Sequence, residues 1–203
     1  MASSSFADRR ISLTTPPAPS RRLLIGAAVA VVFVLAALAV VLLPGSGGHA
    51  TQDERFTAGD RSFSVAVPDG WFAMRPAELK TLPGAPAAVL RSADGRGVVV
   101  VNSGPALARN SRSLTRDLTA QLGRRFAGMK PVTARTVALR GGPAYVYTFA
   151  RPAAARVQSI AVAPRGNRTY TLDAVAGPGA TDVAAQVGAI VRSFDTTNPA
   201  PRS

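Results

Sequence analysis

The pattern of apolar and polar positions divides the chain into one long apolar stretch and a region of short alternating segments. From Leu23 to Leu43 no side chain is charged or strongly polar, and Pro44-Gly45 ends the stretch. At 1.5 Å per residue, a helix of this length spans about 31 Å, which matches the hydrocarbon core of a bilayer. Because only a helix satisfies the backbone of such a segment in lipid, we predict a transmembrane helix here.

The flanking charges predict the orientation of this helix. Arg21 and Arg22 precede it, and no cation follows it before Arg55. Since positive flanks stay in the cytoplasm, we expect a single-pass protein of the cell membrane, with a cytoplasmic N-terminus and residues 46–203 outside. A cleaved signal peptide is the alternative because Gly48-His49-Ala50 resembles a cleavage site, but the apolar core of a signal peptide is shorter.

Beyond the apolar stretch, the spacing of apolar residues predicts strands joined by turns. Phe63, Val65 and Val67 alternate with small residues, which is typical of a half-buried strand. Asp94-Gly95 and Gly141-Gly142 are hairpin turn signals. Further strands are predicted at 88–91, 97–101, 132–139, 144–149, 158–162 and 169–175. The strand at 97–101 is apolar on both faces, so we expect it inside the sheet rather than at its edge.

Two later segments have the spacing of amphipathic helices. Residues 113–126 carry an apolar residue at every fourth position from Leu114 to Phe126. Thr181 is predicted to cap a second helix, which ends near Phe194. These elements predict an α+β fold, in which an antiparallel sheet has its apolar face covered by the two amphipathic helices.

These assignments divide the chain into regions with different roles. Residues 1–22 are rich in Ser, Thr, Pro and Arg and lack the apolar surface needed to fold. Roughly 150 residues follow the membrane stretch, which is enough for one domain. We predict a disordered cytoplasmic tail (1–22), a transmembrane helix (23–43), a juxtamembrane linker (44–60), an extracytoplasmic α+β domain (61–195) and a frayed C-terminus (196–203).

The order of these elements resembles the Mog1/PsbP-like fold. The matching segments are Phe63-Ser64-Val65-Ala66-Val67-Pro68-Asp69-Gly70-Trp71 near the start and Ile190-Val191-Arg192-Ser193-Phe194 at the end. The chain more closely resembles small envelope proteins of actinobacteria that are built on this fold. This resemblance implies a non-catalytic accessory or binding module. Known members often reach the envelope as lipoproteins, whereas this chain has the predicted helix where a lipidated cysteine would be.

Composition narrows the chemistry available to the chain. There is no cysteine, which excludes disulfides, thiolate zinc sites and a thiol nucleophile. The only histidine, His49, lies in the predicted linker, where it is badly placed for triad chemistry. Asp173 is the exceptional carboxylate, predicted in mid-strand, where we expect an ion pair with a cross-strand arginine. No catalytic, nucleotide-binding or metalloprotease motif occurs, so we expect no enzyme activity, no cofactor and no metal.

Arginine is the main functional signal in the sequence. The formal net charge is +13, and the arginine bias suggests a GC-rich genome, such as that of an actinobacterium. Guanidinium groups suit phosphate and carboxylate. We therefore predict that one helix face contacts an envelope protein or an anionic cell-wall polymer; a solvated face is the alternative. An extracytoplasmic domain is not expected to meet nucleic acid. The arginines of this candidate contact face are Arg109, Arg112, Arg116 and Arg124.

Three aromatic residues form a second candidate site. Trp71, Tyr145 and Tyr147 are candidate pocket-lining residues, although such residues more often fill the core between sheet and helix. The leading hypothesis is a membrane-anchored, non-enzymatic binding or accessory module of the cell envelope. The alternatives are an extracytoplasmic carrier of a small apolar ligand between sheet and helices, and a hydrolase with an unrecognised site.

Overall fold

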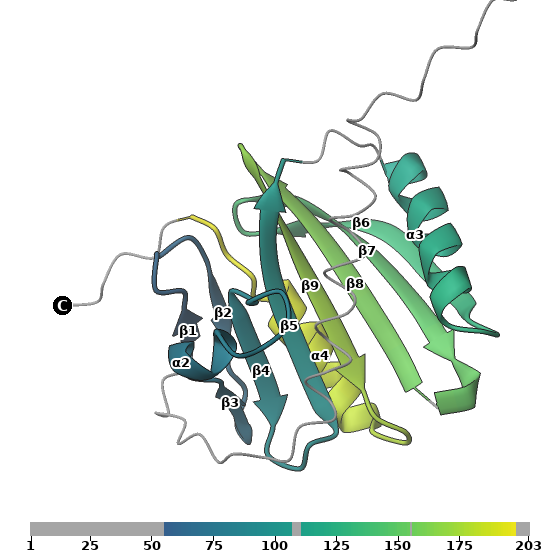
Figure 1. The fold of residues 1–203 in the computed structure, drawn as a ribbon, viewed down its shortest axis with the longest axis horizontal. Helices are drawn as coiled ribbons and strands as arrows, with labels where there is room; N and C mark the ends of the chain where they lie inside the picture. Colours follow the sequence, from purple (N-terminus) through teal and green to yellow (C-terminus); the bar gives the residue numbers. More distant parts are fainter. Residues whose placement is uncertain (1–54, 107–110, 155, 198–203) are drawn as a thin grey trace, which may run out of the picture.

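The chain folds around one large antiparallel sheet. The computed structural model describes residues 55–106, 111–154 and 156–197. Its strands are β1 (Arg55–Thr57), β2 (Ser64–Ala66), β3 (Trp71–Ala73), β4 (Ala88–Ser92), β5 (Gly97–Pro105), β6 (Lys130–Leu139), β7 (Gly142–Arg151), β8 (Arg156–Arg165) and β9 (Arg168–Ala176). Seven of them form a sheet of order β3-β4-β5-β9-β8-β7-β6, and β1 and β2 form a second, two-stranded sheet (Figure 1). The α+β fold with an antiparallel sheet is therefore confirmed.

Helices lie on both faces of the large sheet. They are α2 (Pro76–Leu79), α3 (Ser111–Arg125), α4 (Thr181–Arg192) and the 3-10 helix η1 (Pro152–Ala154). Helix α3 packs over β7 and β8, and α4 packs on the opposite face (Figure 1). This corrects the prediction that both helices cover one face. The physical reason is that interior strands such as β5 are apolar on both sides, so each face needs its own cover.

The α4 side of the sheet holds the larger apolar core. The ring centroids of Phe63 and Phe194 lie 5.4 Å apart, and those of Tyr170 and Phe194 are also 5.4 Å apart. Nearby, the backbones of Ser64 and Asp195 exchange hydrogen bonds of 2.8 and 2.9 Å. The two segments that carry the fold resemblance therefore meet in this core.

The α3 side of the sheet carries two smaller apolar clusters. Under α3, Leu118, Leu122 and Phe126 pack with Tyr145, Tyr147, Phe149, Ile160 and Val162. Under α2, a separate cluster contains Met74, Leu79, Leu82, Val89, Val98 and Val100. Strand β9, which lies between β5 and β8, runs between the two clusters on this face.

Most local predictions agree with the structure, and two differ. Gly95 and Gly141 have φ values of +70° and +86°, which are left-handed conformations that suit glycine in turns. Strand β5 is interior, between β4 and β9, as its two apolar faces predicted. Thr181, however, is the first residue of α4 and not its cap, because Ala180 occupies the N-cap and makes no side-chain capping bond. Strand β1 lies within the segment predicted to be a linker.

The predicted membrane segment lies outside the described residues, as do the cytoplasmic tail and most of the frayed C-terminus. Among the helices that the structure describes, none is long and apolar enough to cross a bilayer. The membrane span over residues 23–43 therefore stays a prediction from the sequence.

Candidate functional site

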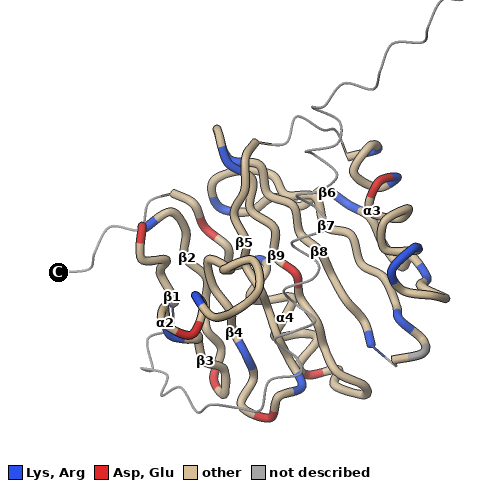
Figure 2. The backbone as a smooth tube through the Cα atoms, in the orientation of Figure 1, with Lys and Arg blue, Asp and Glu red and all other residues tan. Residues whose placement is uncertain are grey.

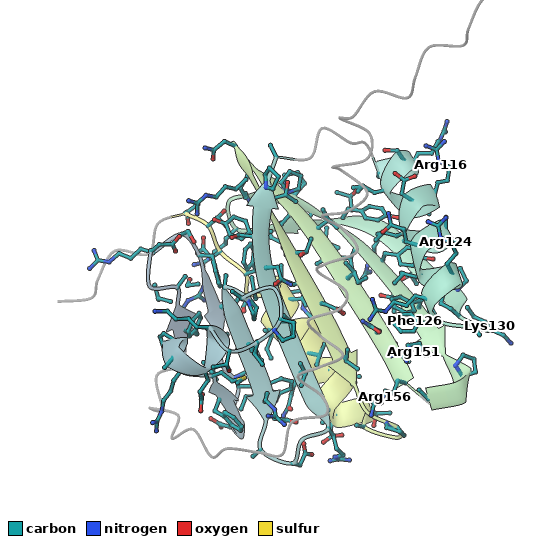
Figure 3. All side chains as sticks on the ribbon, in the orientation of Figure 1. Arg116, Arg124, Phe126, Lys130, Arg151 and Arg156 are labelled. Atoms are coloured by element: carbon teal, nitrogen blue, oxygen red, sulfur yellow. The ribbon has the colours of Figure 1, made fainter. Side chains whose placement is uncertain are left out.

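Helix α3 turns its arginines away from the sheet. Burial of Leu118 and Leu122 against the strands fixes the rotation of the helix. Arg112, Arg116 and Arg124 are consequently exposed to solvent. Figure 3 shows Arg116 and Arg124 on the outer side of the helix. Arg109 lies outside the described residues. The outer side of α3 thus presents a row of guanidinium groups to solvent.

A larger group of cations gathers at the C-terminal end of α3. Figure 2 shows basic positions in blue at this end of the helix and at the adjoining strand ends. Arg151 and Arg156 lie directly opposite one another in the β7–β8 register, because η1 reverses the chain between them. We term the following residues the basic cluster: Arg124 and Arg125 of α3, Lys130 of β6, Arg151 of β7 and Arg156 of β8 (Figure 3).

The ring of Phe126 holds two of these guanidinium groups in place. The Cζ atom of Arg151 lies 3.9 Å from the ring centroid, and that of Arg125 lies 5.5 Å from it. Both distances are within the range in which a cation is attracted to an aromatic face. The ring is itself fixed by stacking on Phe149, with 6.0 Å between centroids. Phe126 therefore anchors the basic cluster to the core of the domain.

The positive charge of the basic cluster is not balanced by nearby ion pairs. Among the described residues, the salt bridges of the domain involve other arginines, such as Arg96 with Asp94 at 2.6 Å and Arg168 with Asp60 at 3.2 Å. Partial burial lowers the pKa of the Arg151 guanidinium, the positive charges of Arg156 and Arg125 lower it further, and the carboxyl of Asp173 acts in the opposite direction. The cluster therefore has residual repulsion that a bound anion would relieve.

Sequence reasoning missed most of the basic cluster. Arg125 was not singled out although it lies in the predicted helix 113–126, and Lys130, Arg151 and Arg156 were missed because the predicted strands stopped short of them. The sequence did contain a signal for this cluster. Successive strands joined by short turns pair as antiparallel neighbours, and each turn brings the end of one strand beside the start of the next. Pairing the successive predicted strands 144–149 and 158–162 and extending both to the turn between them would have placed Arg151 opposite Arg156.

A row of buried polar side chains crosses the α3 side of the sheet between the two apolar clusters. Asn102 of β5 pairs with Thr171 of β9, and Asp173 lies two residues further along β9. Gln158 of β8 donates a hydrogen bond from Nε2 to Asp173 Oδ1 at 2.5 Å. Within the described structure, four buried atoms of this row lack a hydrogen-bond partner: Asn102 Nδ2, Gln158 Oε1, Thr171 Oγ1 and Asp173 Oδ2. This polar row is an unusual feature for the centre of a sheet.

Asp173 does not form the cross-strand ion pair that we expected. The residues opposite it are Val100 and Ile160, so neither neighbouring strand places an arginine there. Burial raises the pKa of its carboxyl to about 7, while the Gln158 hydrogen bond and the charges of Arg125 and Arg151 act in the opposite direction. At neutral pH this carboxyl is therefore only partly ionised, and it neutralises the basic cluster incompletely.

The three candidate pocket aromatics are not brought together. Trp71 lies on the α4 side, where its Nε1 donates a hydrogen bond to Gln186 Oε1 at 2.7 Å. Tyr145 and Tyr147 lie on the α3 side, and the sheet separates them from Trp71. The hydroxyl of Tyr147 hydrogen-bonds that of Thr119 at 2.9 Å, and the hydroxyl of Tyr145 hydrogen-bonds that of Thr115. The polar ends of these aromatics are thus engaged within the fold.

An open depression of about 660 Å³ lies at the other end of β8, where it is lined by Asp60, Arg165 and Arg168, among others. Its arginines already have partners. Arg165 donates to the carbonyl oxygens of Gly142 and Pro143 at 2.8 and 2.7 Å, and Arg168 pairs with Asp60. The basic cluster is therefore the better candidate for contact with an external anion.

The fold and the surface together define a PsbP-like α+β domain with a basic end. Among solved structures, the chain is similar to the cyanobacterial PsbP protein (CyanoP) of Synechocystis sp. PCC 6803, with a TM-score of 0.53 and 14% identity. The match covers 76% of this chain and 97% of that chain. At this identity the similarity shows the fold alone, and it confirms the Mog1/PsbP-like fold.

Two weaker structural similarities accompany it. LpqN, described as involved in cell envelope biogenesis of Mycobacterium tuberculosis, has a TM-score of 0.48 and 12% identity, with 72% of this chain and 86% of that chain covered. A Bacteroides thetaiotaomicron protein has a TM-score of 0.40 and 11% identity, with 75% of this chain and 52% of that chain covered. Neither family models nor curated proteins gave a match to the chain.

Proposed function

We propose that this chain is a membrane-anchored, non-enzymatic accessory module of the bacterial cell envelope that binds an anionic partner through the basic surface of α3 and the adjoining strand ends. The observation that carries the proposal is the basic cluster. Five cationic side chains from four elements meet at one end of the sheet, and within the described residues none of them forms a salt bridge.

The anchor is inferred from the apolar stretch between Leu23 and Leu43. Its length suits a bilayer, and the arginines that precede it favour a cytoplasmic N-terminus. The domain would then stand outside the cytoplasm, a short linker away from the membrane surface. In that position its anionic partner is an envelope protein or an anionic polymer of the cell wall.

Binding fits the location of the charges better than catalysis does. The cations lie on the exposed side of a helix and at the open end of a sheet, not in a concave, water-excluding pocket. Such surfaces accelerate encounter with anionic partners and orient them. The carrier alternative gains no support, because Leu122 and Phe149 are fully buried in one side-chain cluster that fills the space between α3 and the sheet.

The test is salt-dependent binding by the full-length protein. The chain would be placed in nanodiscs of neutral lipid and mixed with envelope material from its native host. We expect binding to fall at least about tenfold when the salt concentration rises from about 0.05 M to about 0.3 M. A variant with Arg112, Arg116, Arg124, Arg125, Arg151 and Arg156 all changed to Gln should lose binding at both concentrations.

A control variant carries Lys80→Gln and Arg192→Gln, which remove two exposed charges from other parts of the domain. This control should bind as the wild type does. Binding that is independent of salt, or that survives the sixfold substitution, would overturn the proposed function.

A further inference from the structure

The sheet register forces two like charges together at the basic cluster. Arg151 and Arg156 are a directly opposed cross-strand pair, and like charges in that position destabilise a sheet. The pairing cannot slip to separate them, because the same register aligns Phe149 with Gln158 and Tyr147 with Ile160 in the buried interior. The fold therefore holds a locally unfavourable pair of charges in a fixed position.

A third guanidinium joins this pair through an aromatic platform. The Cζ atom of Arg151 lies over the Phe126 ring, 3.9 Å from its centroid, and that of Arg125 lies 5.5 Å from the same centroid. An arginine whose flat face rests on a ring keeps its N–H groups at the edge available as donors. Within the described structure, the guanidinium groups of Arg125, Arg151 and Arg156 donate no hydrogen bond to another residue. Their N–H donors are therefore unused within the described residues.

We propose that Arg125 and Arg151 at the Phe126 ring, together with Arg156 opposite Arg151, form a binding site for a phosphate group. A single carboxylate engages one guanidinium fork, whereas a phosphate offers several acceptor oxygens in different directions. It can therefore accept hydrogen bonds from several guanidinium groups that approach from α3, β7 and β8. The inference rests on the proposed function, and it specifies the chemistry that the anionic partner carries.

The outer arginines of α3 have a different role in this arrangement. Arg112 and Arg116 are exposed, and neither stacks on an aromatic ring among the described residues. They contribute diffuse positive potential, which attracts any anion and is screened by salt. These two arginines lie in the first half of α3, whereas the phosphate site lies at the C-terminal end of α3 and the adjoining ends of β7 and β8. Substitutions can therefore separate the two surfaces.

The test is phosphate binding by the full-length protein in nanodiscs of phosphatidylcholine, measured by titration calorimetry with inorganic pyrophosphate in a chloride buffer. The double variant R151Q/R156Q should lower the affinity at least about tenfold. The matched variant R112Q/R116Q removes the same charge from the same surface, and it should change the affinity less than about twofold. The variant R151K/R156K keeps the charge without the planar fork and should fall between them.

A further variant tests the role of the Phe126 ring without changing the charge. Phe126→Leu should weaken pyrophosphate binding, while the thermal unfolding midpoint and the circular dichroism spectrum report whether the variant is folded. Equal losses in R151Q/R156Q and R112Q/R116Q would overturn the proposal, as would wild-type protein that binds pyrophosphate no better than it binds chloride.

Two sources of phosphate are distinguished by two further titrations. Vesicles containing phosphatidylglycerol present lipid phosphates, and soluble poly(glycerol phosphate) presents a phosphodiester polymer. Tighter binding to one of them, lost in R151Q/R156Q, assigns the source. If pyrophosphate binds but envelope material still binds the sixfold Arg→Gln variant, the proposed function fails and the site stands. If salt-sensitive envelope binding occurs without pyrophosphate binding, the site fails and the proposed function stands.

Discussion

The buried carboxyl of Asp173 should make the stability of the domain depend on pH in an unusual direction. Burial raises its pKa from 3.8 to about 7 in the folded protein, so the folded state holds the proton more tightly than the unfolded chain does. The stabilisation linked to that proton is complete below about pH 4 and is lost as the pH rises towards 7. Stability should therefore decline between these values and level off above them.

The magnitude follows from the size of the pKa difference. A difference of about three units corresponds to about 4 kcal/mol, at about 1.4 kcal/mol for each unit. Total unfolding free energies are about 5–15 kcal/mol, so a change of this size is easily measured. Asp173→Asn removes the titration while keeping an oxygen that can accept the hydrogen bond from Gln158. The variant should match the wild type near pH 4 and exceed its stability by up to about 4 kcal/mol at pH 8.

Urea unfolding between about pH 4 and about pH 8.5 provides the assay, with the buried side chain of Trp71, the only tryptophan, as the fluorescent probe. Carboxyls with lowered pKa values do not obscure the effect. The pKa of Asp94 is lowered to about 2 in the folded protein. Its contribution to stability is therefore complete at any pH above the pKa of the unfolded chain, and it is lost only below about pH 4. The reasoning is refuted if the wild type is equally stable across the range, or if Asp173→Asn keeps the wild-type slope.

Two further predictions concern packing, and chemical denaturation measures both. A Cβ atom at Gly97 would lie 2.5 Å from the Trp71 ring and 2.6 Å from Val183, so Gly97→Ala should destabilise the domain by about 1–3 kcal/mol. Its control is Gly123→Ala, where open space surrounds the new methyl within α3 and stability should rise by up to about 1 kcal/mol. Leu122→Ala, at a fully buried position under α3, should cost about 2–5 kcal/mol; a loss below about 1 kcal/mol would contradict the packing described here.

Local features of the fold could be read from the sequence because they depend on near neighbours along the chain. The repeat from Leu114 to Phe126 sets the buried side of α3, and the same rotation turns Arg112 and Arg116 outward. Glycines in turns follow from backbone sterics, as Gly95 and Gly141 show. The Mog1/PsbP-like fold could be recognised because the order of strands and helices could be predicted from these local patterns, even though each matching segment is short.

The sites depend on contacts between residues that are distant in the sequence. Alternation along β9 showed that Asp173 shares a face with Thr171, but only the register shows Val100 and Ile160 as its neighbours and Gln158 as its partner. The prediction that both helices cover one face was likewise wrong, because an apolar stripe shows that a helix packs against a surface but does not show which surface.

The basic cluster shows the division between sequence and tertiary structure most clearly. The sequence by itself determined an arginine-rich chain with an apolar stretch, alternating strands and two amphipathic helices. Tertiary structure decided that Arg125 and Arg151 meet at the Phe126 ring with Arg156 opposite Arg151, because pairing of β7 with β8 and docking of α3 bring together positions that no local period connects. Periodicity is a property of each segment, whereas the meeting of charges is a property of how the segments pack.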